Sequence, residues 1–177
     1  MLEQFRLFSE YNQHMNQRLY AAAAQLSDDD LSRDRGAFFK SVIATLNHIV
    51  VGDIIWLKRF STQPAGAYLL SHTSQLPQPH ALNAMLYDNL ETLRPAREEI
   101  DQLIIQWINN LSEWELAEPI LYKNMAGMHF KKPLESLISH LFLHQVHHRG
   151  QATTLLSQSG IDFGDTDLIE FISDVTG

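Results

Sequence analysis

Four of the nine histidines in the chain lie between residues 140 and 148, and two of these, His144 and His148, are four residues apart. On an α-helix this spacing stacks two imidazoles on one face, one turn apart, so that both can reach the same metal ion. The pair also projects into the apolar stripe of its segment, whereas His140 lies at the edge of that stripe and His147 points further off. The pair therefore suggests two ligands of one metal site. The alternative is that both are core histidines held by hydrogen bonds.

Two imidazoles do not complete a metal site, so a third ligand has to come from another helix. His48 is the one histidine of the expected second helix, and its neighbours on the same face are mostly small or apolar. Three histidine ligands would leave coordination positions open for water or substrate, which is typical of catalytic rather than structural sites. Because the chain has no cysteine, the ligands would be nitrogen and oxygen, which suit Zn²⁺, Ni²⁺, Fe²⁺ or Mn²⁺.

The elements that must position these histidines are helices, because apolar residues recur at three- and four-residue spacing over most of the chain. Four long helices are expected, over residues 2–26, 37–60, 80–110 and 133–158. Residues 61–80, rich in proline and serine, predict a long surface connection. Residues 120–122 and 128–130 are compatible with a small hairpin between the third and fourth helices, and residues 162–172 with a turn and a short helix.

Four amphipathic helices bury their apolar stripes by packing on one another, so the expected fold is all-α, a four-helix bundle. The length of 177 residues fits one domain, residues 1–177. A content of 45% hydrophobic and 19% charged residues excludes an intrinsically disordered chain.

Charge and composition exclude several function classes. With 21 acidic and 13 basic residues the formal net charge is −8, which argues against a nucleic-acid binder. No apolar stretch approaches the roughly 18 residues of a membrane span, and the first residues lack a cationic leader. The absence of cysteine excludes disulfides and thiolate catalysis and fits a reducing compartment. We therefore expect a cytoplasmic protein that binds neither nucleic acid nor membranes.

The run His144-Gln145-Val146-His147-His148-Arg149-Gly150-Gln151 resembles the His-x-x-His-His-Arg-Gly-Gln signature of the DinB family, within the broader DinB/YfiT-like superfamily of inferred metalloenzymes. Shorter agreements extend the resemblance over nearly the whole chain: Leu46-Asn47-His48, Gly52-Asp53, Trp56-Leu57, residues 87–90 and residues 160–168.

This resemblance implies that the family's three metal-binding histidines correspond to His48, His144 and His148, the residues that helix geometry also selects. It implies a four-helix bundle with up-down-down-up connectivity and a divalent metal ion, nickel or zinc. A homodimer is expected from the family's habit and also because the second helix carries two faces that need burial, one with His48 and one apolar.

The function implied by the resemblance is that of a metal-dependent enzyme, a thiol-dependent S-transferase or a hydrolase. Relatives in the superfamily include thiol-dependent S-transferases and a maleylpyruvate isomerase, so the expected partners are a low-molecular-weight thiol and a small-molecule substrate. One alternative is a non-catalytic, metal-binding or stress-associated helical dimer. Another is a helical dimer whose histidines hydrogen-bond one another without a metal.

Four further positions have two interpretations each. Asp53, in the apolar stripe of the second helix, is either an ion-paired structural residue or a general base. Gln151 either hydrogen-bonds the outer nitrogen of a ligand imidazole or lies on the surface. Asn12 and Asn16 either line the pocket or are exposed. A fifth position, Gly150, indicates close packing, because glycine weakens a helix.

Overall fold

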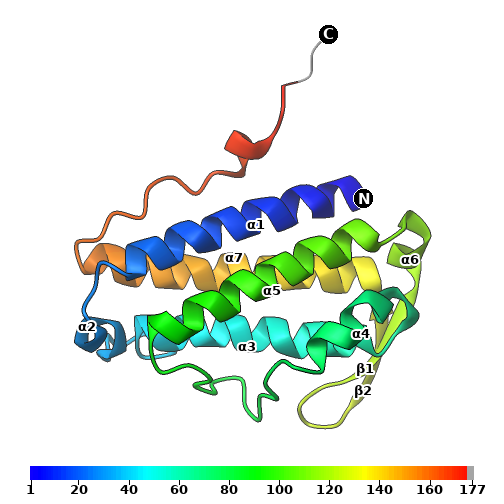
Figure 1. The fold of residues 1–177 in the computed structure, drawn as a ribbon, viewed down its shortest axis with the longest axis horizontal. Helices are drawn as coiled ribbons and strands as arrows, with labels where there is room; N and C mark the ends of the chain where they lie inside the picture. The colour runs from blue at the N-terminus through cyan, green and yellow to red at the C-terminus, as the bar shows by residue number, and fades with distance from the viewer. Residues whose placement is uncertain (175–177) are drawn as a thin grey trace.

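A computed structural model describes residues 1–174 of the chain (Figure 1). The four long amphipathic segments form four long helices: α1 (Leu2–Ala23), α3 (Val42–Ser61), α5 (Leu90–Asn110) and α7 (Leu134–Gln158). The shorter elements are α2 (Asp28–Ser32), α4 (Ala67–Thr73), α6 (Glu113–Ala117), the 3₁₀ turns η1 (Pro64–Gly66) and η2 (Leu168–Phe171), and the strands β1 (Pro119–Lys123) and β2 (His129–Pro133). The prediction of an essentially helical fold is confirmed.

Each long helix lies between two others. The α1 helix packs on α5 and α7, and α3 packs on α7 and α5. In Figure 1, α3 and α5 run from the end that holds α2 toward the end that holds the strands, and α1 and α7 run the other way. The apolar stripes meet between the helices and bury large side chains such as Phe5, Leu46, Trp107 and Leu141, and this burial is the main stabilising contribution to the fold.

The predicted starts of two helices are wrong, for the same physical reason. The second helix was expected from residue 37 but begins at Val42, where the Ser41 side chain accepts a hydrogen bond from the backbone N–H of Ala44. The third was expected from residue 80 but begins at Leu90, where Oδ1 of Asn89 accepts a hydrogen bond of 3.0 Å from the backbone N–H of Thr92. In both cases a polar cap starts the helix later than the apolar period suggests.

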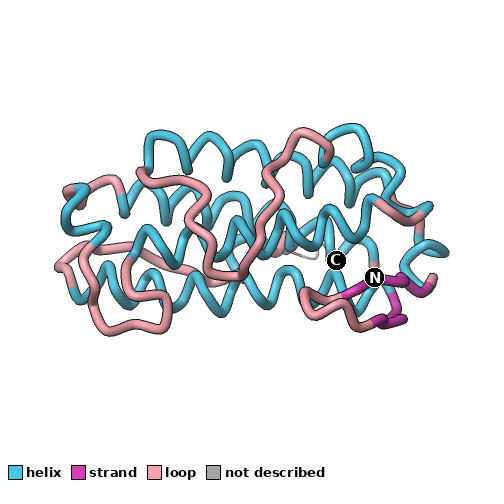
Figure 2. Tube along the Cα trace, turned by 90° about the horizontal axis from the view of Figure 1, so that it is seen from below, coloured by secondary structure: helices cyan, strands magenta, loops and turns pink. Residues whose placement is uncertain are grey.

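The connection expected over residues 61–80 is also partly wrong, because it contains η1 and α4. Leu69 of α4 is fully buried, and the Trp107 indole donates a hydrogen bond to the carbonyl of Ala65 at 2.9 Å. The hairpin is confirmed: β1 and β2 pair antiparallel, and Gly127 provides the positive φ (81°) that its loop requires. Figure 2 shows the strands at one end of the molecule and the loops that cross the helices on this side.

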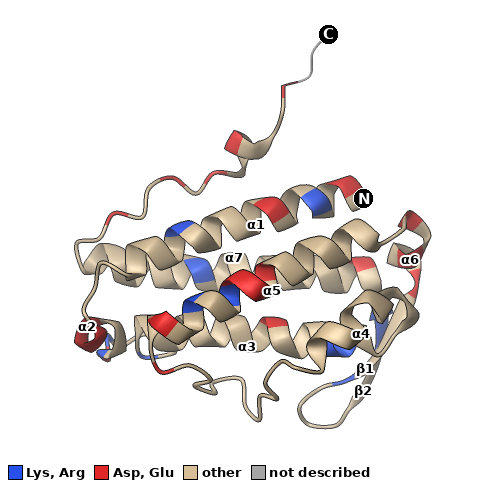
Figure 3. Ribbon diagram, viewed as in Figure 1, with Lys and Arg blue, Asp and Glu red and all other residues tan. Residues whose placement is uncertain are grey.

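Charged groups are unevenly distributed along the helices (Figure 3). Acidic residues cluster in α2, with Asp28, Asp29 and Asp30, whereas the last turn of α3 carries Lys58 and Arg59.

Within residues 1–174, no helix combines the length and the apolar character needed to cross a membrane.

Candidate metal centre

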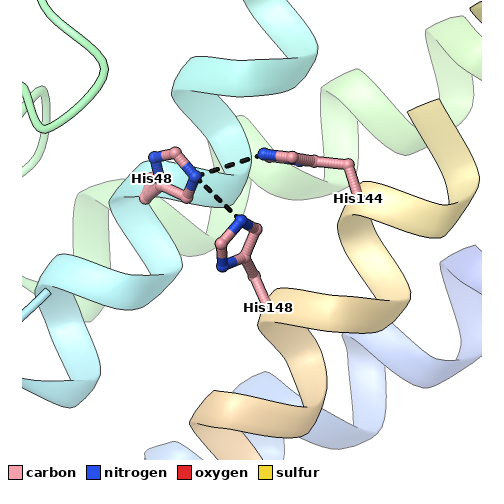
Figure 4. A group of neighbouring side chains, drawn as sticks. All are labelled: His48, His144 and His148. Atoms are coloured by element: carbon pink, nitrogen blue, oxygen red, sulfur yellow. Dashed lines mark hydrogen bonds between the residues drawn. The ribbon is translucent and has the colours of Figure 1, made fainter. Parts of the chain in front are cut away.

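The structure brings the three predicted histidines together between α3 and α7 (Figure 4). His144 and His148 lie on successive turns of α7, and His48 faces them from α3. The Nε2 atom of His48 lies 3.2 Å from Nε2 of His144 and 3.1 Å from Nε2 of His148. One nitrogen from each of the three imidazoles falls within 4.8 Å of the other two, so the group could hold a metal ion.

These separations agree with zinc-like geometry. Two nitrogens bound to a tetrahedral ion at about 2.0–2.1 Å lie roughly 3.3 Å apart. The two short Nε2–Nε2 distances, 3.1 and 3.2 Å, differ little from that value. Two of the three separations are therefore compatible with a small divalent cation, and the third, between His144 and His148, is within 4.8 Å.

Hydrogen bonds fix which nitrogen of two imidazoles faces the centre. The Nδ1 of His48 lies 2.7 Å from the carbonyl oxygen of Leu82, which only accepts, so Nδ1 carries the proton. The Nδ1 of His148 lies 2.8 Å from Oε1 of Gln151, which likewise accepts. Both neutral rings then direct an Nε2 lone pair inward, and such facing lone pairs repel unless a cation lies between them. Of the two interpretations of Gln151, the structure supports hydrogen bonding to an imidazole.

Burial keeps the three imidazoles neutral. It lowers the pKa of His48 and of His148, and it lowers the pKa of His144 to about 3, with a smaller contribution from the neighbouring histidines. Neutral imidazole is the form that binds metals, so no proton has to leave at neutral pH. Nδ1 of His144 is buried without a hydrogen-bond partner among residues 1–174. Hydrogen bonding among residues 1–174 therefore accounts for only one of the two nitrogens of this ring, Nε2, which lies 3.2 Å from Nε2 of His48.

Gly52 makes room for His144. It lies one turn after His48 on α3, and a Cβ at this position would lie 2.7 Å from Cε1 of His144. Gly150 differs from the prediction of close packing, because a Cβ there would meet nothing within 4 Å.

Gly52→Ala is expected to weaken metal affinity by about 10- to 100-fold, because the added methyl displaces the His144 ring. The matched control is Gly150→Ala, close to the histidines on α7, which should leave metal affinity unchanged and stabilise the helix by about 0.5–1 kcal/mol. Competitive titration against a chelating dye measures the first effect, and chemical denaturation measures the second. Equal metal affinities for the Gly52 variant and the unmodified protein would show that the close approach has no role.

Three contributors to the site lie outside the residues selected from sequence. The Phe39 ring stacks on His48 with centroids 3.9 Å apart. Asn47 binds the loop before α5: its Oδ1 accepts from the N–H groups of Leu86 (2.9 Å) and Tyr87 (3.0 Å). This contact places Leu82 against His48. The only sequence signal was the adjacency of Asn47 and His48, since loop docking depends on distant residues.

His140 and His147 lie beside the centre but do not join it. The His140 ring is 5.9 Å from His144 and 5.3 Å from Trp56, centroid to centroid. Burial, followed by the charges of Arg59 and Lys132, lowers the pKa of His140. His147 is exposed on the far side of His148.

Asp53 does not face the centre. It is completely buried and paired with Arg97 of α5, which also contacts Asp101 at 2.9 Å. The structure thus supports the ion-paired interpretation of Asp53 rather than the general base. This pairing covers the second face of α3 within one chain, so the burial of two faces does not by itself require a second subunit.

Asn12 and Asn16 are neither exposed nor part of the histidine site. Both are buried, and both donate to Asp101 and to Gln145 at 2.9–3.3 Å. Arg149 donates in turn to Oδ1 of Asn12 at 2.7 Å. A polar network therefore joins all four long helices on the side of α3 and α7 that faces away from the histidines.

Two cavities give access to the histidines. One, of about 440 Å³, is lined by His48, Gly52, Trp56, Arg59, His140 and His144, among others. The other, of about 470 Å³, is lined by Phe38, Phe39, Asn83 and all three site histidines, with Leu82 at the border of both. An ion at the centre would therefore be reachable by a small molecule.

Comparison with known proteins agrees with this architecture. The DinB family model matches residues 1–174. The chain is also similar to "Protein DinB" of Bacillus subtilis (strain 168), with 25% identity over 163 residues that cover 92% of this chain and 90% of that protein. Since the family match includes the helices that carry all three histidines, the chain belongs to the DinB family.

Proposed function

We propose that this protein binds one divalent metal ion, nickel or zinc, through Nε2 of His48, His144 and His148. The observation that carries the proposal is the convergence of three neutral imidazoles, two of them held in the required tautomer by Leu82 and Gln151. Membership of the DinB family supports the same conclusion. The directions of the long helices support the up-down-down-up connectivity expected for this family (Figure 1).

We further propose that the site is catalytic, of a thiol-dependent S-transferase or hydrolase type. A bound ion supplies Lewis acidity and lowers the pKa of a ligand in an open coordination position. The chain's own residues would hold that ion, keep the imidazoles oriented and admit the reactants through the two cavities. Cavities of this size suit a small-molecule substrate and a low-molecular-weight thiol.

The alternative is a non-catalytic metal-binding or stress-associated protein. What favours it is that, within residues 1–174, no carboxylate lines either cavity beside the histidines, and Asp53, the carboxylate considered from sequence, is buried in an ion pair. Under either proposal we expect a homodimer, because members of the family are often dimeric. A monomeric mass by light scattering would contradict this expectation.

Protein purified without a polyhistidine tag is expected to contain about one nickel or zinc ion per chain by elemental analysis, in line with a single three-ligand site. Removal of the ion by a chelator should lower the melting temperature, and adding it back should restore the original value. Metal-free protein that gains no stability from added Zn²⁺ or Ni²⁺ would contradict the metal site.

Metal-loaded protein should then be tested with low-molecular-weight thiols and electrophilic substrates, comparing the unmodified chain with His48→Ala. Turnover that disappears in this variant supports the enzyme, whereas turnover that survives excludes a metal-centred mechanism. Stoichiometric metal without turnover of any pair would favour the non-catalytic alternative.

A further inference from the structure

The cavity between the histidines and the hairpin differs in charge from the rest of the molecule. It adjoins a further cavity of about 450 Å³, and the two share Ile55, Arg59, Asn124 and Met125; we call this joined space the Arg59 cleft. Among residues 1–174, no aspartate or glutamate lines either part, whereas Lys58, Arg59 and Lys123 do. In a chain with a formal net charge of −8, a cleft lined only by neutral and basic side chains attracts anions.

Arg59 is held at the wall of the cleft without a polar partner. Its guanidinium lies over the rings of Trp56 and Tyr122, 4.6 and 5.1 Å from their centroids. The side chain is half-buried, and within residues 1–174 its recorded contacts are these two aromatic rings, with no hydrogen bond or ion pair. Aromatic stacking fixes the plane of the guanidinium and leaves its N–H donors free for a ligand.

Arg59 differs in this respect from every other arginine of the chain. Each of the other seven has an oxygen acceptor within the protein: Arg6, Arg18, Arg33, Arg35, Arg94, Arg97 and Arg149. An arginine that is positioned by stacking and has no acceptor within residues 1–174 keeps its N–H donors available to water or to an anion. An anionic ligand in the cleft would supply such an acceptor.

The cleft connects Arg59 with the histidines along one wall. Trp56 contacts both the Arg59 guanidinium and the His140 ring, and the His140 ring lies 5.9 Å from that of His144. Positions 48 and 59 are about three turns apart on α3, and Trp56 and His140 lie between the guanidinium and His144. A ligand that reaches both Arg59 and the histidines therefore has to pass these two side chains.

We propose that Arg59 binds a carboxylate on the substrate, at the end opposite to the group that reacts at the histidines. The planar guanidinium matches a carboxylate in shape and charge, and the apolar side chains of Ile55, Trp56 and Met125 would contact the apolar body of such a molecule. As a statement about substrate, this inference rests on the function proposed above. The binding of the anion itself does not require the metal.

Hexanoate and 1-hexanol are suitable probes, because they share a chain length and differ in charge. Each is titrated into ¹⁵N-labelled protein, metal-free and zinc-loaded, and the shift of the Trp56 indole resonance is followed by NMR. The resonance is assigned with Trp56→Phe, and the buried Trp107 indole, which donates to Ala65, serves as an internal reference. Hexanoate is expected to bind about tenfold more tightly than 1-hexanol in both forms, as one charge-assisted hydrogen bond provides.

Arg59→Met keeps an apolar stem and removes the charge, so it should abolish the preference for hexanoate. Arg59→Lys keeps the charge and should retain part of the preference. The matched control is Lys131→Met, which removes one positive charge from the exposed face of β2, outside the lining of the cleft. This control should behave like the unmodified protein.

The outcomes separate this inference from the proposed function. A hexanoate preference in metal-free protein that Arg59→Met abolishes supports the inference, even if no metal binds and the proposed function fails. Equal binding of both probes to the unmodified protein overturns the inference, even if zinc binds stoichiometrically. A preference that is unchanged in Arg59→Met, as when zinc alone holds the carboxylate, overturns it as well.

Discussion

His144→Ala is expected to abolish the stabilisation of this protein by Zn²⁺ or Ni²⁺. A ligand present at 1,000 times its Kd stabilises a folded protein by about 4 kcal/mol. Removing one of three imidazoles leaves only His48 and His148, so the affinity falls by orders of magnitude and the stabilisation approaches zero. The metal-free forms should differ little, because the variant also removes a buried nitrogen, Nδ1 of His144, that has no partner among residues 1–174. Thermal unfolding with and without added metal, after chelation, measures both effects.

His147→Ala is the matched control for this experiment. His147 lies one residue before His148 on the same helix, but it is exposed and does not belong to the three-histidine group. Its replacement should leave the response to metal unchanged, which separates a specific site from general binding to a histidine-rich surface. An equal response to metal in His144→Ala and the unmodified protein would refute the site.

The convergence of the histidines could be predicted because most of it is local. Two residues four apart on a helix face the same way whatever the rest of the fold does. The third, His48, was found because the second helix offers no other histidine. The groups that orient these rings differ in predictability: Gln151 is three residues from His148, whereas Leu82 reaches His48 only because Asn47 binds a distant loop.

The wrong helix starts show where the apolar period misleads. Phe39 and Leu82 continue the apolar spacing of the second and third predicted helices, yet both lie in loops beside the site. Ser41 and Asn89 cap the N-termini of α3 and α5, so the helices begin after them and exclude these two residues. An N-cap of this kind contributes about 0.5–2 kcal/mol to stability. The sequence contained both caps, but a serine or an asparagine is too common to identify a helix start alone.

The buried polar network could not be predicted, because its partners belong to different helices. Asn12 and Asn16 are an ordinary polar pair four residues apart until α1 packs on α5 and brings Asp101 to them. The packing of α5 on α3 explains the second buried face of α3, where Asp53 meets Arg97. The second face of α3, whose expected burial was one reason to predict a dimer, is therefore covered by α5 of the same chain.

Arg97→Met is expected to destabilise the protein by about 3–5 kcal/mol at neutral pH, because it leaves Asp53 and Asp101 buried without their shared partner. Burial already raises the pKa of Asp53 to about 6 against the attraction of Arg97, and it raises that of Asp101. A carboxyl group with a raised pKa stabilises the fold at low pH, and this contribution is lost as the pH rises through the folded value. Removing Arg97 raises both pKa values further, so the loss of stability should grow from about pH 5 to about pH 8. Urea denaturation across this range measures it.

Arg94→Met separates the buried pair from ion pairing in general. Arg94 lies one turn before Arg97 on α5 and pairs with Glu98 at 3.0 Å, but both side chains are about half exposed, at 48% and 51%. Water solvates the carboxylate that remains, so this change should cost no more than about 0.5 kcal/mol at any pH in the range. If the two variants lose similar stability, or if the deficit of Arg97→Met shrinks as the pH rises, the carboxylates of Asp53 and Asp101 are not held uncompensated in the core. The polar network would then serve to align the four long helices, and its charges would contribute little to stability.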